Sequence, residues 1–198
     1  MGVDYSKAFK NFNVNIGGHV TPLWFDGNYY RIQSSVLTGI QKSVTKSWRL
    51  ASRLMLRKTN NNENELLDTD DYSLKLTSQH FFDNWRFSLS AERLVEDGQV
   101  DSNSRTIDSL SLNSFWLLNQ QWLTAIDLSF QQHEYEGTHP YYLEEREDDV
   151  WLFSSFVQYN LSKTFSYRLN INVQDKNSNL DLFSYNRSEI SLSASMNF

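Results

Sequence analysis

Apolar and polar residues alternate with period two along most of the chain. The clearest example is EISLSASMNF at 189–198, where every second residue from Ile190 to Phe198 is apolar and the residues between them are polar. Such a period is typical of a β-strand with one apolar and one polar face. In all, eight segments show it: 11–16, 48–57, 72–79, 85–92, 122–133, 151–161, 165–174 and 189–198.

Two further segments, 30–41 and 105–118, also predict strands, although their alternation is less regular. Each has apolar residues on both parities, as at Val36 beside Leu37 and at Phe115 beside Trp116. No segment has apolar residues at helical spacing over a useful length. The sequence therefore predicts an all-β chain of ten strands.

The connections between these strands fall into two kinds that alternate along the chain. Short turns are expected at 42–46, 82–84, 118–121 and 162–164, and longer polar loops at 21–28, 59–70, 96–103, 136–148 and 176–184. In an up-and-down sheet, alternate connections lie at opposite ends. All short turns are thus expected at one end and all long loops at the other.

This segregation is typical of transmembrane β-barrels of the bacterial outer membrane, with short periplasmic turns and long extracellular loops. We therefore predict a ten-stranded antiparallel up-and-down transmembrane β-barrel, with residues 1–198 as a single domain and both termini on the periplasmic side. The apolar face would contact lipid and the polar face would line the lumen. A soluble ligand-binding barrel, with its apolar parity pointing inward, is the structural alternative.

Aromatic residues are expected to form a ring at each membrane interface. Four of them follow the short turns, and the first three are 37 residues apart, which indicates a repeat of hairpins. The predicted girdle residues are Trp48, Trp85, Trp122, Phe165 and Phe198 at the turn end, and Tyr72, Tyr135, Trp151 and Tyr185 at the other end.

Composition restricts the alternatives. The net charge of −6 argues against a nucleic-acid partner. The absence of cysteine excludes a disulfide framework and a thiolate metal site. No apolar run approaches the roughly 18 residues of a membrane helix. The first residues, MGVDYSKAF, do not resemble a signal peptide, which is expected of a mature or excised chain or of the C-terminal part of a longer protein.

The last strand, with its alternation ending at Phe198, resembles the C-terminal signal that the barrel-assembly machinery recognises in bacterial outer-membrane proteins. This resemblance assigns the signal to Ile190, Leu192, Met196 and Phe198. The last hairpin, with Asn177-Ser178-Asn179 followed by Tyr185-Asn186-Arg187, is similar to that of barrels that follow periplasmic tetratricopeptide repeats. Those barrels include surface-lipoprotein translocators and exopolysaccharide exporters, and the resemblance covers about 35 residues.

The polar parity of the strands carries most of their charged residues, and two interpretations are open. The charges could form a basic lumen that guides an anionic solute or polymer, or they could fill a narrow lumen with salt bridges. The predicted lumen-lining charged residues are Arg49, Arg53, Arg57, Lys75, Arg86, Glu92, Asp127, Arg168, Arg187 and Glu189.

Candidates for chemistry are few. His133 and Glu134, with Asp70 and Asp71 at another rim, would suit an outer-rim hydrolase only if His133 reached a carboxylate. The acidic run 144–149 could bind a divalent cation, although such runs are usually solvated. We therefore expect no enzyme activity, no resident metal and no cofactor.

The first functional hypothesis is export or passage of a polymer, polypeptide or small solute across the outer membrane. The second is a non-transporting anchor, receptor or adhesin that acts through its loops, and the third is an outer-rim hydrolase. Expected partners are outer-membrane lipid and lipopolysaccharide and the barrel-assembly machinery, with a periplasmic or extracellular protein also compatible.

Overall fold

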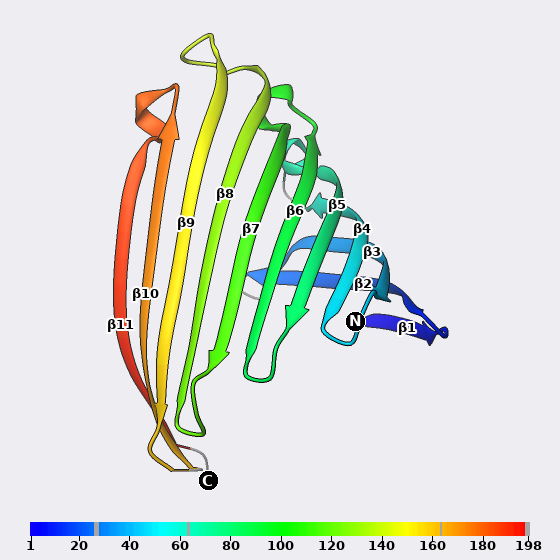
Figure 1. Ribbon diagram of the computed structural model, residues 1–198. Helices are drawn as coiled ribbons and strands as arrows, with labels where there is room; N and C mark the ends of the chain where they lie inside the picture. The colour runs from blue at the N-terminus through cyan, green and yellow to red at the C-terminus, as the bar shows by residue number, and fades with distance from the viewer. Residues whose placement is uncertain (26–27, 63, 163, 197–198) are drawn as a thin grey trace.

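The described part of the chain forms one antiparallel sheet in which each strand pairs with its neighbours in sequence (Figure 1). The computed structural model describes residues 1–25, 28–62, 64–162 and 164–196. The eleven strands are β1 (Gly2–Ala8), β2 (Phe12–Phe25), β3 (Asn28–Ser43), β4 (Trp48–Asn61), β5 (Thr69–Phe81), β6 (Trp85–Gly98), β7 (Arg105–Leu117), β8 (Trp122–Thr138), β9 (Glu145–Asn160), β10 (Phe165–Ser178) and β11 (Tyr185–Met196).

The two ends of the sheet differ in their connections. Turns of three or four residues join β1 to β2, β3 to β4, β5 to β6, β7 to β8 and β9 to β10 at one end, which we call the turn end. The opposite end, the loop end, carries single 3-10 turns at η1 (Glu65–Leu67), η2 (Asp101–Asn103) and η3 (Asp181–Phe183). Among the described residues, no helix is long and apolar enough to cross a membrane.

Strand pairing divides the sheet into two chemically distinct faces. In β4, Trp48, Leu50, Leu54 and Leu56 share one face, and the register places each opposite a residue of β5 on that same face. This is the apolar face. The intervening residues, such as Arg53, lie on the polar face. The register carries these faces across all eleven strands, so the period-two pattern of the sequence becomes a continuous property of the sheet.

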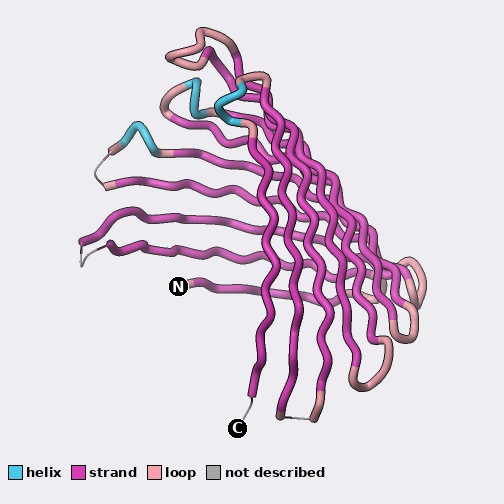
Figure 2. Tube along the Cα trace, turned by 90° about the vertical axis from the view of Figure 1, so that its left-hand side faces the viewer, coloured by secondary structure: helices cyan, strands magenta, loops and turns pink. Residues whose placement is uncertain are grey.

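Burial is the reverse of that in a soluble protein. On the strands, the buried side chains are mainly polar and belong to the polar face, for example Ser73, Ser90 (5% exposed) and Asp148 (2% exposed). Leu56 (62% exposed) and Leu192 (74% exposed) are among many large apolar side chains exposed on the apolar face. The polar face is therefore the more enclosed side. Viewed from the side, the sheet is strongly twisted, and the strands near the N-terminus run across those near the C-terminus (Figure 2).

The strand count differs from the prediction, because the sheet has eleven strands and not ten. The additional strand, β1, pairs with the first half of β2 from Gly2↔His19 to Ala8↔Asn13. Its apolar parity contains Val3 and Tyr5 but also Lys7, so the alternation is too weak to predict a strand. With an odd number of strands, the chain enters β1 from the loop end and leaves β11 at the turn end. The expectation of both termini at one end is therefore wrong.

The strands are also longer than predicted, and the loops correspondingly shorter. The expected loop 21–28 is mostly strand, because β2 continues to Phe25 through an irregularity between Leu23 and Trp24. The expected loop 136–148 shrinks to 139–144, between β8 and β9. At 145–148 the strand lies beyond the apolar belt and is polar on both faces, so its sequence does not differ from that of a loop.

The described residues form an open sheet, with no pairing between β1 and β11 among them. These two edge strands run in the same direction, because direction alternates from strand to strand and both strands have odd numbers. Direct closure between them would thus be parallel, whereas single-chain bacterial outer-membrane barrels have even numbers of antiparallel strands. The fold is an eleven-stranded up-and-down antiparallel sheet.

Candidate functional site

The apolar face carries a belt next to the turn end. In five strands it comprises five successive positions on that face, within 48–56 of β4, 72–80 of β5, 122–130 of β8, 151–159 of β9 and 165–173 of β10. The next position on the loop side is polar in every one of these strands: Lys58, Asp70, Gln132, Asp149 and Asp175. We call this surface the apolar belt.

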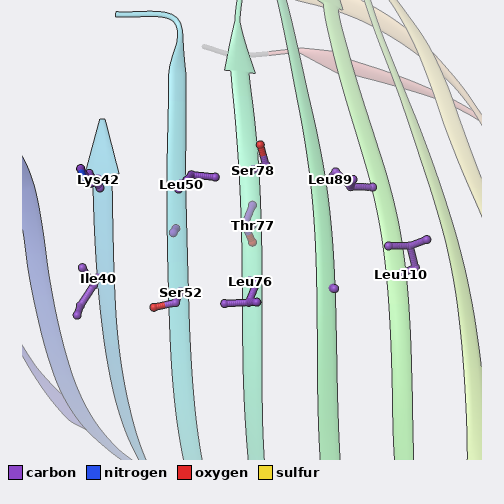
Figure 3. A pocket seen from close by; sticks show the side chains of 11 residues that line it. Ile40, Lys42, Leu50, Ser52, Leu76, Thr77, Ser78, Leu89 and Leu110 are labelled. Atoms are coloured by element: carbon purple, nitrogen blue, oxygen red, sulfur yellow. The ribbon is translucent and has the colours of Figure 1, made fainter. Parts of the chain in front are cut away.

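Small residues make shallow depressions in the apolar belt. Ser52 and Ala91 lie between larger neighbours, so that a hollow crosses β3 to β7. Figure 3 shows Ile40, Leu76 and Leu110 around this hollow. Its lining is mainly aliphatic, which suits hydrocarbon better than a polar ligand.

Aromatic rings border the apolar belt at its turn end. Trp48 stacks on His80, with 5.7 Å between ring centroids, and Trp122 lies 4.7 Å from Tyr159. Trp85 lies 5.6 Å from Trp116. Trp48, Trp85, Trp122 and Phe165 each begin a strand directly after a turn, as the sequence suggested. His80, Trp116 and Tyr159 are further members that come from the strands entering those turns.

The loop-end aromatics are divided between the two faces. Tyr72 and Trp151 lie on the apolar face, where Trp151 lies 4.7 Å from Phe130. Tyr135 and Tyr185 lie on the polar face, opposite Arg105 and Lys176 respectively. The register therefore separates these two tyrosines from the other expected girdle residues.

Two ion pairs lie on the apolar face of the described strands: Lys58 with Asp70, 3.1 Å apart and beyond the belt, and Arg93 with Asp108. Arg93 of β6 binds Asp108 of β7 through two hydrogen bonds of 2.7 and 2.5 Å. Their transverse row continues through Gln132 and Asp149. On the β5 side the row continues through Leu74 and Leu54, within the belt, so the pair limits the belt only in β6 and β7. The sequence pattern did not distinguish this pair.

The register places all ten predicted lumen-lining charged residues on the polar face, where some are paired and others are not. Lys75 binds Glu92 at 3.1 Å, and Arg187 lies 3.4 Å from Glu189. Arg57 contacts Asp71 and Glu96 at 2.5 and 3.6 Å respectively. In the described part of the chain, no carboxylate lies within 4.0 Å of Arg49, Arg53, Arg86 or Arg168.

The paired charges form a network at the loop end of the polar face. From Arg57 it continues through Glu96 to Arg105, which donates a hydrogen bond to the Tyr135 hydroxyl at 3.0 Å. Acids and bases alternate along this path. The network therefore fixes side chains of four neighbouring strands, β4 to β7, and of β8 without a large excess of either charge.

A second part of this network is centred on Asp148 of β9. Arg146 donates two hydrogen bonds to its carboxylate at 3.0 and 2.8 Å, and Lys176 of β10 lies at 2.8 Å. The Arg146 guanidinium also lies over the rings of Tyr135 and Phe183. Burial by itself would raise the pKa of Asp148, but the hydrogen bonds from Arg146 and Lys176 hold it below its ordinary value. Asp148 is thus a buried anion held by two cations.

His133 has no catalytic partner in this arrangement. Its Nε2 contacts the Gln131 side chain at 3.1 Å, and its Nδ1 is buried without a hydrogen bond. Asp148 is its cross-strand neighbour but is bound by Arg146 and Lys176. Burial lowers the pKa of His133, and the positive charge of Arg105 lowers it further. In the described structure, His133 thus lacks the carboxylate contact that acid–base work at this rim would need.

The acidic run 144–149 is divided between the two faces of the sheet. Residues 145–149 belong to β9, so Glu145, Glu147 and Asp149 point to one face while Arg146 and Asp148 point to the other. Within the described segments, no group of three acidic or histidine side chains is arranged to hold a metal ion. The acidic residues, although close together in sequence, are therefore separated by the alternation of the strand.

The turn end of the polar face combines arginines with phenylalanines. The Arg49 guanidinium lies over Phe81 at 4.6 Å, Arg86 over Phe115 at 5.5 Å and Arg168 over Phe156 at 4.2 Å. Each phenylalanine lies on a strand adjacent to that of its arginine. Sequence reasoning missed these rings, although Phe115 beside Trp116 had disturbed the alternation of β7. That disturbance was the available signal.

Of the expected assembly signal, Ile190, Leu192 and Met196 are exposed on the apolar face of β11. Phe198 lies outside the described residues. The three described members therefore share the face that carries the apolar belt.

Comparisons with known proteins give no family. No protein-family model matches the chain, and no curated protein does. Seven solved chains match, among them the ferric yersiniabactin uptake receptor of Yersinia pestis, at 9% identity and a TM-score of 0.46. The match covers 98% of this chain and 40% of the receptor chain, so this chain spans about two fifths of the receptor's length. Likeness at that level identifies neither a family nor a function.

Proposed function

We propose that this chain forms the wall of a β-barrel in the outer membrane of a Gram-negative bacterium and lines a polar passage through it. Its turns would face the periplasm and its loops the exterior. The passage would serve a small solute, a polymer or a polypeptide. Outer-membrane lipid, lipopolysaccharide and the barrel-assembly machinery are the proposed partners.

The inversion of burial carries this proposal. A soluble sheet protein packs its apolar face into a core and exposes its polar face, and soluble monomers rarely expose apolar patches larger than a few hundred Å². Here the apolar face is exposed across the whole sheet, while serines and ion pairs fill the enclosed face. Lipid is the medium in which this arrangement is stable, because it solvates the apolar belt without cost.

The width of the belt suits a bilayer. Trp48 and Leu56, its limits in β4, are eight residue steps apart, which is about 27 Å along a strand at ~3.4 Å per residue. A tilt of about 40° reduces this to roughly 21 Å between backbone positions, close to the ~25 Å apolar band of outer-membrane barrels once side chains are added. Aromatic rings at its turn-end limit agree with an interface at that height.

A closed barrel requires pairing beyond that of the described sheet, which is open between β1 and β11. In lipid, the unpaired backbone groups of β1 and β11 would be costly. We propose that the barrel is completed at these edges, either by a parallel pairing of β1 with β11 or by further strands. Helical-repeat export proteins, whose last hairpin resembles that of this chain, are one setting for such a wall.

The loop-end charge network favours a second candidate, a non-transporting anchor or receptor. Its paired side chains span β4 to β10 at the height where a passage would open to the exterior. If they close the lumen, the loops would provide the function instead. Neither candidate uses His133 as a catalytic group, and we propose that the protein is not an enzyme.

Conductance in planar bilayers tests the passage directly. Purified folded protein, checked by the different electrophoretic migration of heated and unheated samples, is added to a lipid bilayer between salt solutions. A passage predicts stepwise current increases of constant size. Silence at all voltages, with insertion verified by protease protection, would contradict it and support the anchor.

A further inference from the structure

Three arginine–phenylalanine pairs occupy one zone of the polar face. Phe81, Arg86, Phe115 and Phe156 belong to one transverse row of the sheet, connected by the pairings of β5 to β9. Arg49 belongs to the row next to it on the loop side, and Arg168 to the row next to it on the turn side. We call the set Arg49, Phe81, Arg86, Phe115, Phe156 and Arg168 the arginine–phenylalanine band.

The guanidinium groups of this band have no anionic partner. Two carboxylates, Asp127 and Glu189, belong to the same three rows in the described strands. Asp127 accepts a hydrogen bond from Asn113 at 2.6 Å, and Glu189 contacts Arg187. Glu189 is thus paired outside the band, whereas Asp127 has an amide partner and no cation within 4.0 Å in the described residues. At the loop end, by contrast, each buried carboxylate binds one or two cations.

The phenyl rings orient the arginines. A guanidinium group that lies over a ring keeps its N–H groups at its edge, free to donate in the plane. Arg168 is further held by hydrogen bonds of 2.9 and 2.6 Å to the Gln158 side-chain oxygen. Beside Arg86, a cavity of about 390 Å³ is lined by polar side chains that include Asn113 and one carboxylate, that of Asp127. The band therefore presents pre-oriented donors beside open space.

We propose that the arginine–phenylalanine band binds a polyanion, a solute that carries several carboxylate or phosphate groups. Arginine donates two parallel hydrogen bonds to either group. Arg49 and Arg86 are two strands apart, about 10 Å at ~4.8 Å per strand, which is too far for one small anion to bridge. Successive charges of a chain molecule match that spacing. The inference rests on the proposed function only in treating the polar face as accessible to solute.

The arginine–phenylalanine band also differs in charge from the rest of the chain. The whole chain has a net charge of −6, and the acidic run 144–149 lies at the loop end. Three arginines without a carboxylate contact, against one carboxylate without a cation, Asp127, leave these rows of the polar face with an excess of positive charge. A polyanion would be attracted from the turn side, which in the proposed orientation is the periplasm.

Calorimetric titration of folded protein in zwitterionic detergent micelles tests the proposal. The probes are an oligogalacturonate for carboxylates, sodium tripolyphosphate for phosphates and neutral dextran as the uncharged reference. We expect wild-type protein to bind at least one anionic probe at low salt and not to bind dextran. In the triple variant Arg49→Gln, Arg86→Gln and Arg168→Gln, we expect affinity to fall at least tenfold.

A second triple variant, Lys7→Gln, Lys42→Gln and Lys46→Gln, is the matched control. It removes the same number of charges at the same end of the molecule, but Lys7 and Lys42 lie on the apolar face and Lys46 lies in a turn. Its affinity should stay within twofold of wild type. Equal losses in both variants, an unchanged arginine variant, or no binding of either anion by wild type would overturn the proposal.

Conductance separates this inference from the proposed function. Anion binding without conductance would support the band and contradict an open passage. Conductance without anion binding would support the passage and contradict the band.

Discussion

The two faces of the sheet are built from the same strands, yet their side chains make different kinds of contact. On the apolar face, the proposed lipid contacts are interchangeable, because hydrocarbon accepts leucine and isoleucine alike. On the polar face, partners are specific: Asp148 has two cations and Tyr135 has Arg105. The residues of the apolar face therefore need only suit the surrounding medium, whereas those of the polar face need to suit one another as specific pairs. Substitutions of adjacent residues on opposite faces can test this difference.

The largest effect is expected from a charge in the middle of the apolar belt. Leu169 and Asn170 are adjacent in β10 and lie on opposite faces. Leu169→Arg should lower the free energy of unfolding in lipid vesicles by about 2–4 kcal/mol, the cost of an arginine at a bilayer midplane. Asn170→Arg should cost less than half of that. Urea titration of both variants followed by tryptophan fluorescence measures the difference, and equal losses would contradict the assignment of faces.

The next effect concerns the buried anion. Asp148→Asn leaves Arg146 and Lys176 without their carboxylate and should cost about 2–3 kcal/mol of unfolding free energy. The adjacent Asp149 lies on the apolar face beyond the belt, so Asp149→Asn should change stability by less than about 0.5 kcal/mol. The same urea titration applies. A greater loss in the Asp149 variant would reverse the proposed roles of the two faces.

A smaller effect is expected from pH. Because the folded-state pKa of His133 is lowered, the unfolded chain takes up a proton first as pH falls below its ordinary value of about 6.5. The contribution of His133 to the free energy of unfolding is thus complete above that pH. It declines as pH falls, until the folded-state pKa is passed. His133→Gln should flatten the decline below pH 6.5. An unchanged slope would mean that His133 titrates normally in the folded protein.

The smallest effect is expected at the turn-end aromatic ring. Trp85 Nε1 donates a hydrogen bond of 2.7 Å to the Ser114 hydroxyl on the apolar face. Trp85→Phe retains a ring but loses this bond, which should cost about 0.5–1.5 kcal/mol. Ser114→Ala removes the same bond from the other side and provides the control. A double variant that loses the full sum of both would show that the bond does not couple them.

The alternation of apolar and polar residues predicted most strands of this sheet. It did not predict β1 or the strand ends beyond the belt, and both failures have a physical reason. Within the belt, lipid-type and water-type faces differ, so β4, β6, β8 and β10 could be located from their alternation and their opening aromatics. In β9 beyond the belt both faces are polar, and Glu145–Asp148 therefore looked like a loop. In β1, Lys7 shares the parity of Val3 and Tyr5, which hides the strand.

Parity predicted which face carries the charged residues, but it predicted neither their partners nor the phenylalanines beside the arginines. Parity alone places Arg57 and Arg86 on the same face. It does not show that Arg57 meets Asp71 and Glu96 while Arg86 meets Phe115, because those contacts depend on register between strands. Register is set by turns and by the whole sheet. Closure likewise depends on contacts between edges that are far apart in sequence.

The central claim is that one face of the sheet contacts lipid and the other contacts water. The chain has no cysteine, so single cysteines at each position from 165 to 174 can carry a nitroxide spin label in lipid vesicles. Relaxation by oxygen reports lipid, and relaxation by a water-soluble nickel chelate reports water. We predict oxygen maxima at the odd positions and nickel maxima at the even ones. Uniform accessibility, or nickel maxima at the odd positions, would contradict the account.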